Sequence, residues 1–158
     1  PYAYVDSVFA INYQKLYNMG YRGLIFDIDN TLVHHGDDST PEIDDLFFRI
    51  QKMGFKTLLL SNNTEERIES FLKNIDSLYI HDAAEMLGIE KEKIMFIGDQ
   101  VFTDILGANR CGLDSILVKF IRIDNNAPIG KRRHAENIIL KFYRRNKKYR
   151  DRLGDITV

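Results

Sequence analysis

The chain has 158 residues and a mass of 18.4 kDa, a size that suits one domain rather than two. Hydrophobic residues make up 44% of the sequence and charged residues 28%, and these ordinary values exclude a wholly disordered protein. The single cysteine, Cys111, excludes a disulfide-stabilised scaffold and a cysteine-rich zinc site.

The formal net charge of −1 is unevenly divided along the chain. Residues 1–130 contain 12 basic and 20 acidic residues, a formal charge of −8. Residues 131–158 contain ten basic and three acidic residues, a formal charge of +7. This asymmetry predicts an acidic core domain over residues 1–130, followed by a basic, helical C-terminal tail over residues 131–158.

Short apolar runs alternate with amphipathic segments along the first 118 residues, and they predict strands and helices respectively. The expected elements are, in chain order, a strand at Arg22–Asp27, a helix from Pro41 to about Met53 capped by Thr40, a strand at Phe55–Leu60, a helix through Lys73 capped by Asn63 or Thr64, strands at Leu78–Ile80 and Ile94–Ile97, a helix at Thr103–Arg110, and a strand at Ser115–Val118. This alternation predicts an α/β fold, with a doubly wound, mostly parallel sheet and helices on both faces.

Polar side chains stand where three of the predicted strands end. Asp27 and Asp29 close the first strand, Ser61 follows the second, and Asp99 follows the fourth with Asp104 soon after. The carboxyl ends of parallel strands share one edge of a sheet, where open α/β proteins bind ligands. Four carboxylates at one place repel each other unless a cation lies among them, and oxygen ligands without histidine or cysteine favour Mg²⁺. The alternative is that these residues only form turns and caps.

Asp27 and Asp29 stand two positions apart, so in extended backbone their side chains point the same way. One of them can attack a phosphate ester and become an aspartyl-phosphate. The other can give a proton to the leaving group and later take one from water. His34 and His35 follow closely, and we expect them in an exposed loop, with a substrate contact as the alternative.

The segments DIDNTLV (27–33), SNN (61–63) and GDQVFTD (98–104) resemble motifs I, II and IV of the haloacid dehalogenase (HAD) superfamily. With GDQVFTDILGANRCG followed by ILV, the chain is closely similar to subfamily IIIA, the YqeG-type phosphatases, over roughly Ile11–Val118. The resemblance implies a HAD-like Rossmannoid fold with little or no cap domain. It also implies a Mg²⁺-dependent phosphomonoester hydrolase that works through an aspartyl-phosphate.

The resemblance further assigns roles to six residues. Asp27 would be the nucleophile and a Mg²⁺ ligand, Asp29 the acid/base and a metal ligand through its backbone carbonyl, Asp99 a Mg²⁺ ligand, Asp104 an outer-shell or water-mediated metal partner, and Ser61 with the amide of Asn62 the holder of the transferring phosphoryl group. A catalytically impaired binding module of the same fold, with the basic tail on a polyanion such as membrane or RNA, is the alternative function.

One family feature is missing from the chain. HAD enzymes also carry a lysine, usually in a Lys-Pro pair, and this sequence has no Lys-Pro. Lys91 and Lys93 precede the fourth predicted strand, so they are expected at the opposite edge of the sheet. The stretch from Ile80 to Glu92 is also short for a parallel crossover. We therefore hypothesise that a lysine-bearing segment is missing near His81–Ala84.

The tail is predicted to form a helix over Glu136–Leu153. Its apolar residues Ile139, Phe142, Tyr143, Tyr149 and Leu153 share roughly one face, and lysines and arginines crowd the rest. This face could pack on the domain, lie on an anionic membrane surface or accompany a contact with RNA.

Partner and location follow from the same features. We expect a phosphorylated, membrane-borne substrate, because some YqeG-type relatives act on phosphatidylglycerophosphate, and we do not expect nucleic acid as the main partner. The chain has no transmembrane-sized apolar run, which would take roughly 20 residues, and no secretory pattern at its start. We therefore expect a cytoplasmic protein with peripheral contact at the inner face of the membrane.

Overall fold

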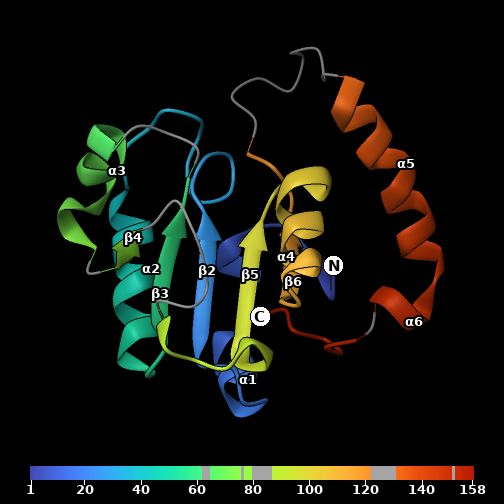
Figure 1. Ribbon diagram of the computed structural model, residues 1–158, viewed down its shortest axis with the longest axis horizontal. Helices are drawn as coiled ribbons and strands as arrows, with labels where there is room; N and C mark the ends of the chain where they lie inside the picture. Colours follow the sequence, from blue (N-terminus) through green and yellow to red (C-terminus); the bar gives the residue numbers. More distant parts are fainter. Residues whose placement is uncertain (62–64, 76, 80–86, 122–130, 151) are drawn as a thin grey trace.

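The computed structural model describes residues 1–61, 65–75, 77–79, 87–121, 131–150 and 152–158. They form a six-stranded sheet in the order β1-β6-β5-β2-β3-β4, and every strand pair in it is parallel (Figure 1). The strands are β1 (Ala3–Val5), β2 (Gly23–Asp27), β3 (Lys56–Leu60), β4 (Leu78–Tyr79), β5 (Ile94–Gly98) and β6 (Asp114–Val118). The predicted parallel α/β sheet is therefore confirmed.

Helices and short helical turns connect these strands. The α-helices are α1 (Tyr13–Asn18), α2 (Pro41–Lys52), α3 (Glu65–Phe71), α4 (Leu106–Arg110), α5 (Lys131–Arg145) and α6 (Lys147–Arg150). The short turns are η1 (Val8–Ala10), η2 (Leu72–Asn74), η4 (Lys91–Lys93) and η5 (Val101–Ile105), the last with π-helical geometry. None of the helices in the described ranges is long and apolar enough to cross a bilayer.

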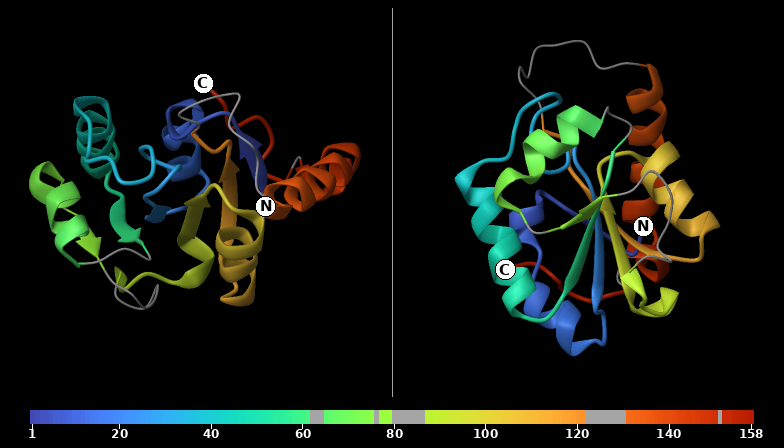
Figure 2. Two further views of the ribbon diagram at one scale, coloured as in Figure 1. Left: turned by 90° about the horizontal axis from the view of Figure 1, so that it is seen from above. Right: turned by 60° about the vertical axis from the view of Figure 1, so that its left-hand side comes forward.

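Both faces of the sheet are covered because its central strands are apolar on both sides. Leu24 and Phe26 of β2 belong to the larger core, which also contains Phe47 of α2 and Phe71 of α3. Ile25, between them, belongs to a second core with Ala108 of α4. Seen from above in Figure 2, α2 and α4 lie on opposite sides of the sheet, and α5 lies beyond one of its edges. The doubly wound arrangement is thus confirmed.

Helix α2 begins and ends where the sequence signals lie. The Thr40 hydroxyl accepts a hydrogen bond from the Ile43 backbone N–H at 3.4 Å, and Pro41 occupies the first turn. The helix stops before Gly54, whose φ of 102° lies in the left-handed region that favours glycine. The expected caps at Asn63 and Thr64, and the segment His81–Ala84, lie outside the described residues.

Four elements differ from the prediction. Strand β1 and helix α1 were not expected, because three and six residues give too short a pattern to recognise. The helix expected at Thr103–Arg110 begins as the π turn η5. The tail helix starts earlier than predicted, at Lys131, and divides at Asn146, whose side-chain oxygen accepts from the Lys148 N–H at 3.1 Å and so caps α6.

The tail divides its apolar residues between the core and the surface. Tyr143 and Leu153 are buried, and Leu153 packs in the larger core together with Ile156. In contrast, Phe142 is 66% exposed, and Ile139 and Tyr149 are also exposed. The five residues expected on one helical face therefore do not form a single face. Within α5, Tyr143 is buried whereas Ile139 and Phe142 face solvent, and Tyr149 and Leu153 lie beyond the end of α5. The boundary between core domain and tail at residue 130 stays a prediction.

Because Leu153 is buried in the main core, we expect Leu153→Ala to lower the free energy of unfolding by about 2–4 kcal/mol. The matched control is Ile138→Ala, which truncates an exposed aliphatic side chain of the same tail and should change stability by less than about 0.5 kcal/mol. Urea unfolding of the three proteins measures both values. Equal stability of Leu153→Ala and wild type would show that the C-terminal segment is not part of the folded core.

Candidate active site

The central strands create a switch point in the sheet. Strand β2 lies between β5 and β3, and the chain builds β3 and β4 on one side before it returns to build β5 and β6 on the other. Connections that leave β2 and β5 therefore diverge at the carboxyl edge, and open α/β sheets bind their ligands in that gap. Asp27 ends β2 and Asp99 directly follows β5, so both carboxylates lie at this gap.

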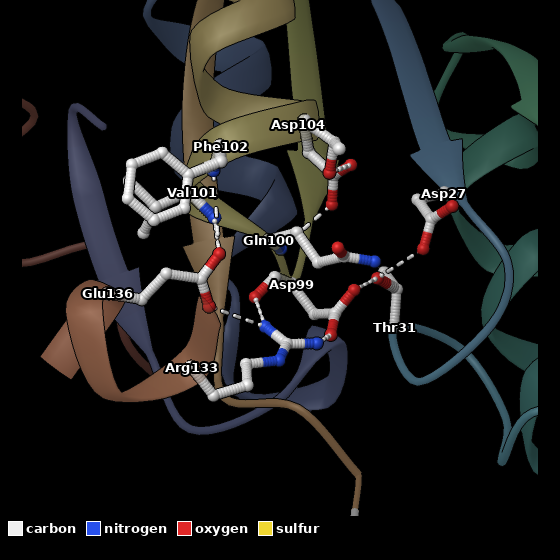
Figure 3. Close-up of polar contacts among 10 residues, drawn as sticks. Asp27, Thr31, Asp99, Gln100, Val101, Phe102, Asp104, Arg133 and Glu136 are labelled. Atoms are coloured by element: carbon white, nitrogen blue, oxygen red, sulfur yellow. Dashed lines mark hydrogen bonds and ion pairs between the residues drawn. The ribbon is translucent and has the colours of Figure 1, made fainter. Parts of the chain in front are cut away.

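Three aspartates meet there. Asp27, Asp99 and Asp104 each offer a carboxylate oxygen, and these oxygens all lie within 4.8 Å of one another (Figure 3). Asp99 is only 3% exposed, and the other two are partly buried. We call this group the carboxylate cluster. The structure thus brings together three of the residues predicted around the metal; their roles remain predictions.

A tight turn after β2 places the side chain of Thr31 between Asp27 and Asp99. Asn30 adopts φ of 64°, a left-handed conformation that asparagine tolerates better than most residues. The turn buries Thr31, whose hydroxyl lies 3.0 Å from Oδ2 of Asp27 and 3.4 Å from Oδ1 of Asp99. Thr31 was part of the quoted motif but had no assigned role. Its hydroxyl orients two of the three carboxylates.

Asp104 reaches the cluster because the chain after β5 turns back sharply. Its Oδ2 accepts from the Gln100 backbone N–H and its Oδ1 from the Thr103 hydroxyl, both at 2.8 Å. A Cβ atom at Gly98 would lie 2.4 Å from Oδ2 of Asp104. Only glycine at position 98 therefore allows this approach. The Asp104 carboxylate stands beside the other two, and its predicted outer-shell or water-mediated role stays a prediction.

The Asp29 carboxylate is held separately, by the loop that follows. Its Oδ1 accepts from the Gly36 backbone N–H at 2.9 Å and lies 3.3 Å from Nδ1 of His35. Among the described acidic residues, the carboxylate cluster does not include Asp29. The predicted metal contact of Asp29 through its backbone carbonyl remains a prediction. His35, expected as an exposed loop residue, is exposed but also contacts this carboxylate.

Ser61 directly follows β3, in the register that pairs Leu60 with Asp27. It is 8% exposed, so its side chain lies within the sheet edge rather than in solvent. Adjacent parallel strands therefore place Ser61 beside the end of β2, as the sequence predicted for a phosphoryl-binding residue. Asn62, the predicted partner of Ser61, lies outside the described residues.

The cluster is electrostatically unfavourable without a cation. Burial, together with the neighbouring charges of Asp104 and Asp99, raises the pKa of Asp27 to about 8. Burial also raises the pKa of Asp99 to about 6, against the opposing effect of Arg133. The pKa of Asp104 is raised by burial too, although its hydrogen bond with Gln100 opposes this. Three converging carboxylate oxygens in this state fit a hard divalent cation such as Mg²⁺.

The basic residues of the chain differ in how near they lie to the carboxylate cluster. Lys91 and Lys93 lie in η4, just before β5, so they stand at the opposite edge of the sheet as expected. Within the described ranges, the ion pair to the carboxylate cluster comes instead from Arg133 of α5, which binds Asp99. Arg133 and its partner Glu136 were not predicted as site residues. No local signal marks them, because the residues of the site that they contact lie at least 34 positions away in the sequence.

The raised pKa of Asp27 predicts a pH-dependent stability. The native state holds this proton up to about pH 8, whereas the unfolded chain releases it near the ordinary aspartate pKa of 3.8, so metal-free stability should fall as pH rises between these values. Asp27→Asn removes this loss and should be more stable than wild type by on the order of 1–3 kcal/mol at about pH 9, with little difference near about pH 4.

Urea unfolding at both pH values, with EDTA and with Mg²⁺, tests this prediction. Mg²⁺ should stabilise wild type at the higher pH and should stabilise Asp27→Asn much less. Asp6→Asn, a change at an exposed aspartate, serves as the control. A metal-free wild type as stable as Asp27→Asn at the higher pH would show that the cluster carries no such repulsion.

The chain is similar to known proteins in sequence and in fold. A HAD-hydrolase-like family model matches residues 76–120, the segment that contains Asp99 and Asp104. The probable phosphatase YqeG of Bacillus subtilis (strain 168) is 31% identical over 157 residues, which covers 92% of this chain and 91% of that protein. A crystal structure of an uncharacterized protein from Listeria monocytogenes serotype 4b has a TM-score of 0.50 and 17% identity, and it covers 76% of this chain and 99% of its own; it supports the fold alone.

Identity that extends over nearly the whole of both chains identifies the family, and the resemblance first based on three short motifs is thereby confirmed. Together with the HAD-like match over the second half of the site, it shows that the chain belongs to the HAD-like hydrolases, among the YqeG-type phosphatases.

Proposed function

We propose that this phosphatase is a Mg²⁺-dependent phosphomonoester hydrolase that forms an aspartyl-phosphate on Asp27. The observation that carries the proposal is the carboxylate cluster, in which oxygens of Asp27, Asp99 and Asp104 lie within 4.8 Å of one another. These three residues would hold the ion, with the Asp29 carbonyl as a further ligand. Bound Mg²⁺ would neutralise charge on the phosphoryl oxygens and keep the carboxylates ionised.

In the first step, a carboxylate oxygen of Asp27 attacks the phosphorus atom, and the bond from phosphorus to the ester oxygen breaks. Asp29 gives its proton to the departing oxygen, so the alcohol leaves neutral. Thr31 supports this step, because its hydrogen bond to Oδ2 of Asp27 restricts the rotation of the nucleophile. The Ser61 hydroxyl and the Asn62 amide would donate to the phosphoryl oxygens.

In the second step, Asp29 takes a proton from water, and the water oxygen attacks the phosphorus. The bond between phosphorus and Asp27 breaks, which releases inorganic phosphate and restores the carboxylate. A side chain that acts as acid and base needs a carboxylate that does not coordinate the metal. The separate holding of the Asp29 side chain by the Gly36 N–H and His35 supports its use for proton transfer.

Phosphate release from an aryl phosphate with Mg²⁺ tests the mechanism. Asp27→Asn should lower kcat by about 10³-fold or more because no acyl-phosphate can form. Asp29→Asn should lower it by about 10²–10⁴-fold because proton transfer is lost. EDTA should abolish turnover in wild type, and Asp6→Asn should retain it.

A rapidly quenched reaction should also show a covalent phosphoryl group on the peptide that contains Asp27. Turnover by Asp27→Asn at the rate of wild type would refute the nucleophile. A wild-type protein that binds Mg²⁺ but hydrolyses neither aryl phosphates nor phospholipid monoesters would support the binding-module alternative.

We further propose that the substrate phosphate is carried by a phospholipid headgroup, such as that of phosphatidylglycerophosphate, and that α5 docks on an anionic membrane surface. Three large apolar side chains on α5 are exposed, Ile138 at 56%, Ile139 at 39% and Phe142 at 66%. The exposed Lys131, Lys141 and Arg145 flank them. An exposed apolar stripe bordered by cations matches a helix that lies in the plane of an anionic membrane.

The packing of α5 directs this stripe outward. Its buried residues are Glu136 and Tyr143, seven positions apart and so on one face of the helix. At 3.6 residues per turn, Ile138 lies about 150° and Phe142 about 110° around the helix axis from these two residues, so both point away from the buried face. We call Ile138, Phe142, Lys141 and Arg145 the outer face of α5. Only the short loop His34–Thr40 lies between the β2 turn and α2, which leaves little chain for a lid against a large substrate.

Docking can be tested by co-sedimentation of the full chain with vesicles of phosphatidylglycerol and phosphatidylcholine. Phe142→Ser should weaken binding by about 10- to 150-fold, because the insertion of an aromatic side chain into lipid contributes about 1.5–3 kcal/mol. The matched control is Phe48→Ser on α2, since Phe48 is 65% exposed. Binding should weaken with salt and vanish on pure phosphatidylcholine.

Point variants are preferable to deletion of residues 131–158, because that segment supplies Leu153 and Ile156 to the core. Vesicle binding that is equal in wild type and Phe142→Ser would contradict the docking surface. Salt-sensitive binding of RNA in the same concentration range, with no binding of vesicles, would favour the polyanion alternative instead.

A further inference from the structure

The side of α5 that bears Arg133 and Glu136 contacts the segment that contains Asp99 and Asp104 of the carboxylate cluster (Figure 3). The Arg133 guanidinium donates through Nη1 to the backbone carbonyl of Asp99 at 2.7 Å, and its Nη2 pairs with Oδ2 of the Asp99 carboxylate. One side chain thereby binds the backbone and the carboxylate of the same residue. Oδ1 of Asp99 is left turned toward Thr31 and Asp27.

Glu136, one turn further along α5, binds the next part of that segment. Its Oε1 accepts from the backbone N–H groups of Val101 at 2.9 Å and Phe102 at 3.4 Å. Its Oε2 accepts from Nη1 of Arg133 at 3.0 Å. We call this pair the Arg133–Glu136 clamp. It holds the first turn of η5, the element that carries Asp104.

The clamp is buried, unlike an ordinary surface ion pair. Glu136 is 3% exposed, and a buried carboxylate is costly unless its oxygens find donors. Here two backbone amides and a guanidinium supply them. The guanidinium carbon of Arg133 also lies 4.6 Å from the centre of the Phe120 ring, which packs against the plane of the fork. Each contact reduces the freedom of Arg133, as a positioning role requires.

From this geometry we infer that the Arg133–Glu136 clamp positions Asp99 and Asp104 for metal binding, so that the tail helix is a working part of the active site. Arg133 fixes one oxygen of Asp99 and so presents the other to the cluster. Glu136 fixes the start of η5 and so sets where Asp104 stands. The inference rests on the proposed function, because it takes these carboxylates as ligands of Mg²⁺.

A counter-charge would behave differently from a positioning residue. If Arg133 served only to neutralise the charge of Asp99, its removal would make the cluster bind Mg²⁺ more tightly, and any positively charged side chain could replace it. If its fork geometry matters, lysine should fail although the charge is retained, because an ammonium cannot bind the Asp99 carbonyl, the Asp99 carboxylate and Glu136 in the same planar arrangement. Arg133→Lys therefore separates geometry from charge.

The experiment compares wild type, Arg133→Lys, Glu136→Gln and the control Arg132→Lys, the same change at the exposed neighbouring arginine. Titration calorimetry measures the dissociation constant of Mg²⁺, and hydrogen exchange of the metal-free protein measures the protection of residues 99–104. Thermal unfolding of each variant identifies any general loss of stability. None of these readouts depends on turnover.

In Arg133→Lys we expect the Mg²⁺ dissociation constant to rise about 3–10-fold and the amides of Val101 and Phe102 to exchange faster, with Arg132→Lys unchanged. Glu136→Gln should also speed this exchange. Binding of Mg²⁺ as tight as or tighter than wild type in Arg133→Lys, or unchanged exchange in both clamp variants, would overturn the inference. Absence of Mg²⁺ binding by wild type would instead refute the proposed function, and exchange alone would then decide whether the clamp orders the segment.

Discussion

The repulsion among Asp27, Asp99 and Asp104 is the constraint on which the site depends. Like charges that converge in a partly buried place would separate if the backbone let them. The sheet prevents this, because β2 and β5 are hydrogen-bonded neighbours with Phe26 opposite Ile97, and both side chains are fully buried. Separation of Asp27 from Asp99 would therefore require the disruption of the main core. The fold therefore holds the carboxylates together, which is the arrangement that the proposed Mg²⁺ site requires.

Two local features of the backbone fix the positions of the carboxylates further. The Asn30 turn buries the Thr31 hydroxyl between two carboxylates, and Gly98 leaves room for the third. Each of these removes a degree of freedom that the cluster would otherwise use to relax. The pKa values of Asp27 and Asp99, raised chiefly by burial, reflect the electrostatic cost that is left. Under the proposed function, binding of a divalent cation would offset this cost, so that the preorganised site could hold a strongly hydrated ion such as Mg²⁺.

Much of this site could be predicted from the sequence because its signals are local. An apolar strand followed by Asp, Ser or Gly-Asp marks the carboxyl end of a parallel strand, and parallel strands share that edge whatever lies between them. The same reasoning could not find Arg133 and Glu136. In sequence they are an ordinary i,i+3 pair in a helix rich in charge, and their targets lie 34 or more residues away. Strand β1 was missed for a related reason, since three residues acquire their meaning only by pairing with β6.

Helix α5 has a buried, hydrogen-bonded face and an exposed face with apolar and basic side chains. The two proposals about this helix concern different faces, so they can be tested separately. Arg133 and Glu136 on its inner face exchange hydrogen bonds with the segment that bears Asp99 and Asp104. The outer face, with Ile138 and Phe142, is solvent-exposed and points away from the buried face. A substitution on one face leaves the contacts of the other intact, so effects on metal affinity and on lipid binding need not move together. Where they do move together, the helix itself must carry the coupling between the membrane surface and the carboxylate cluster.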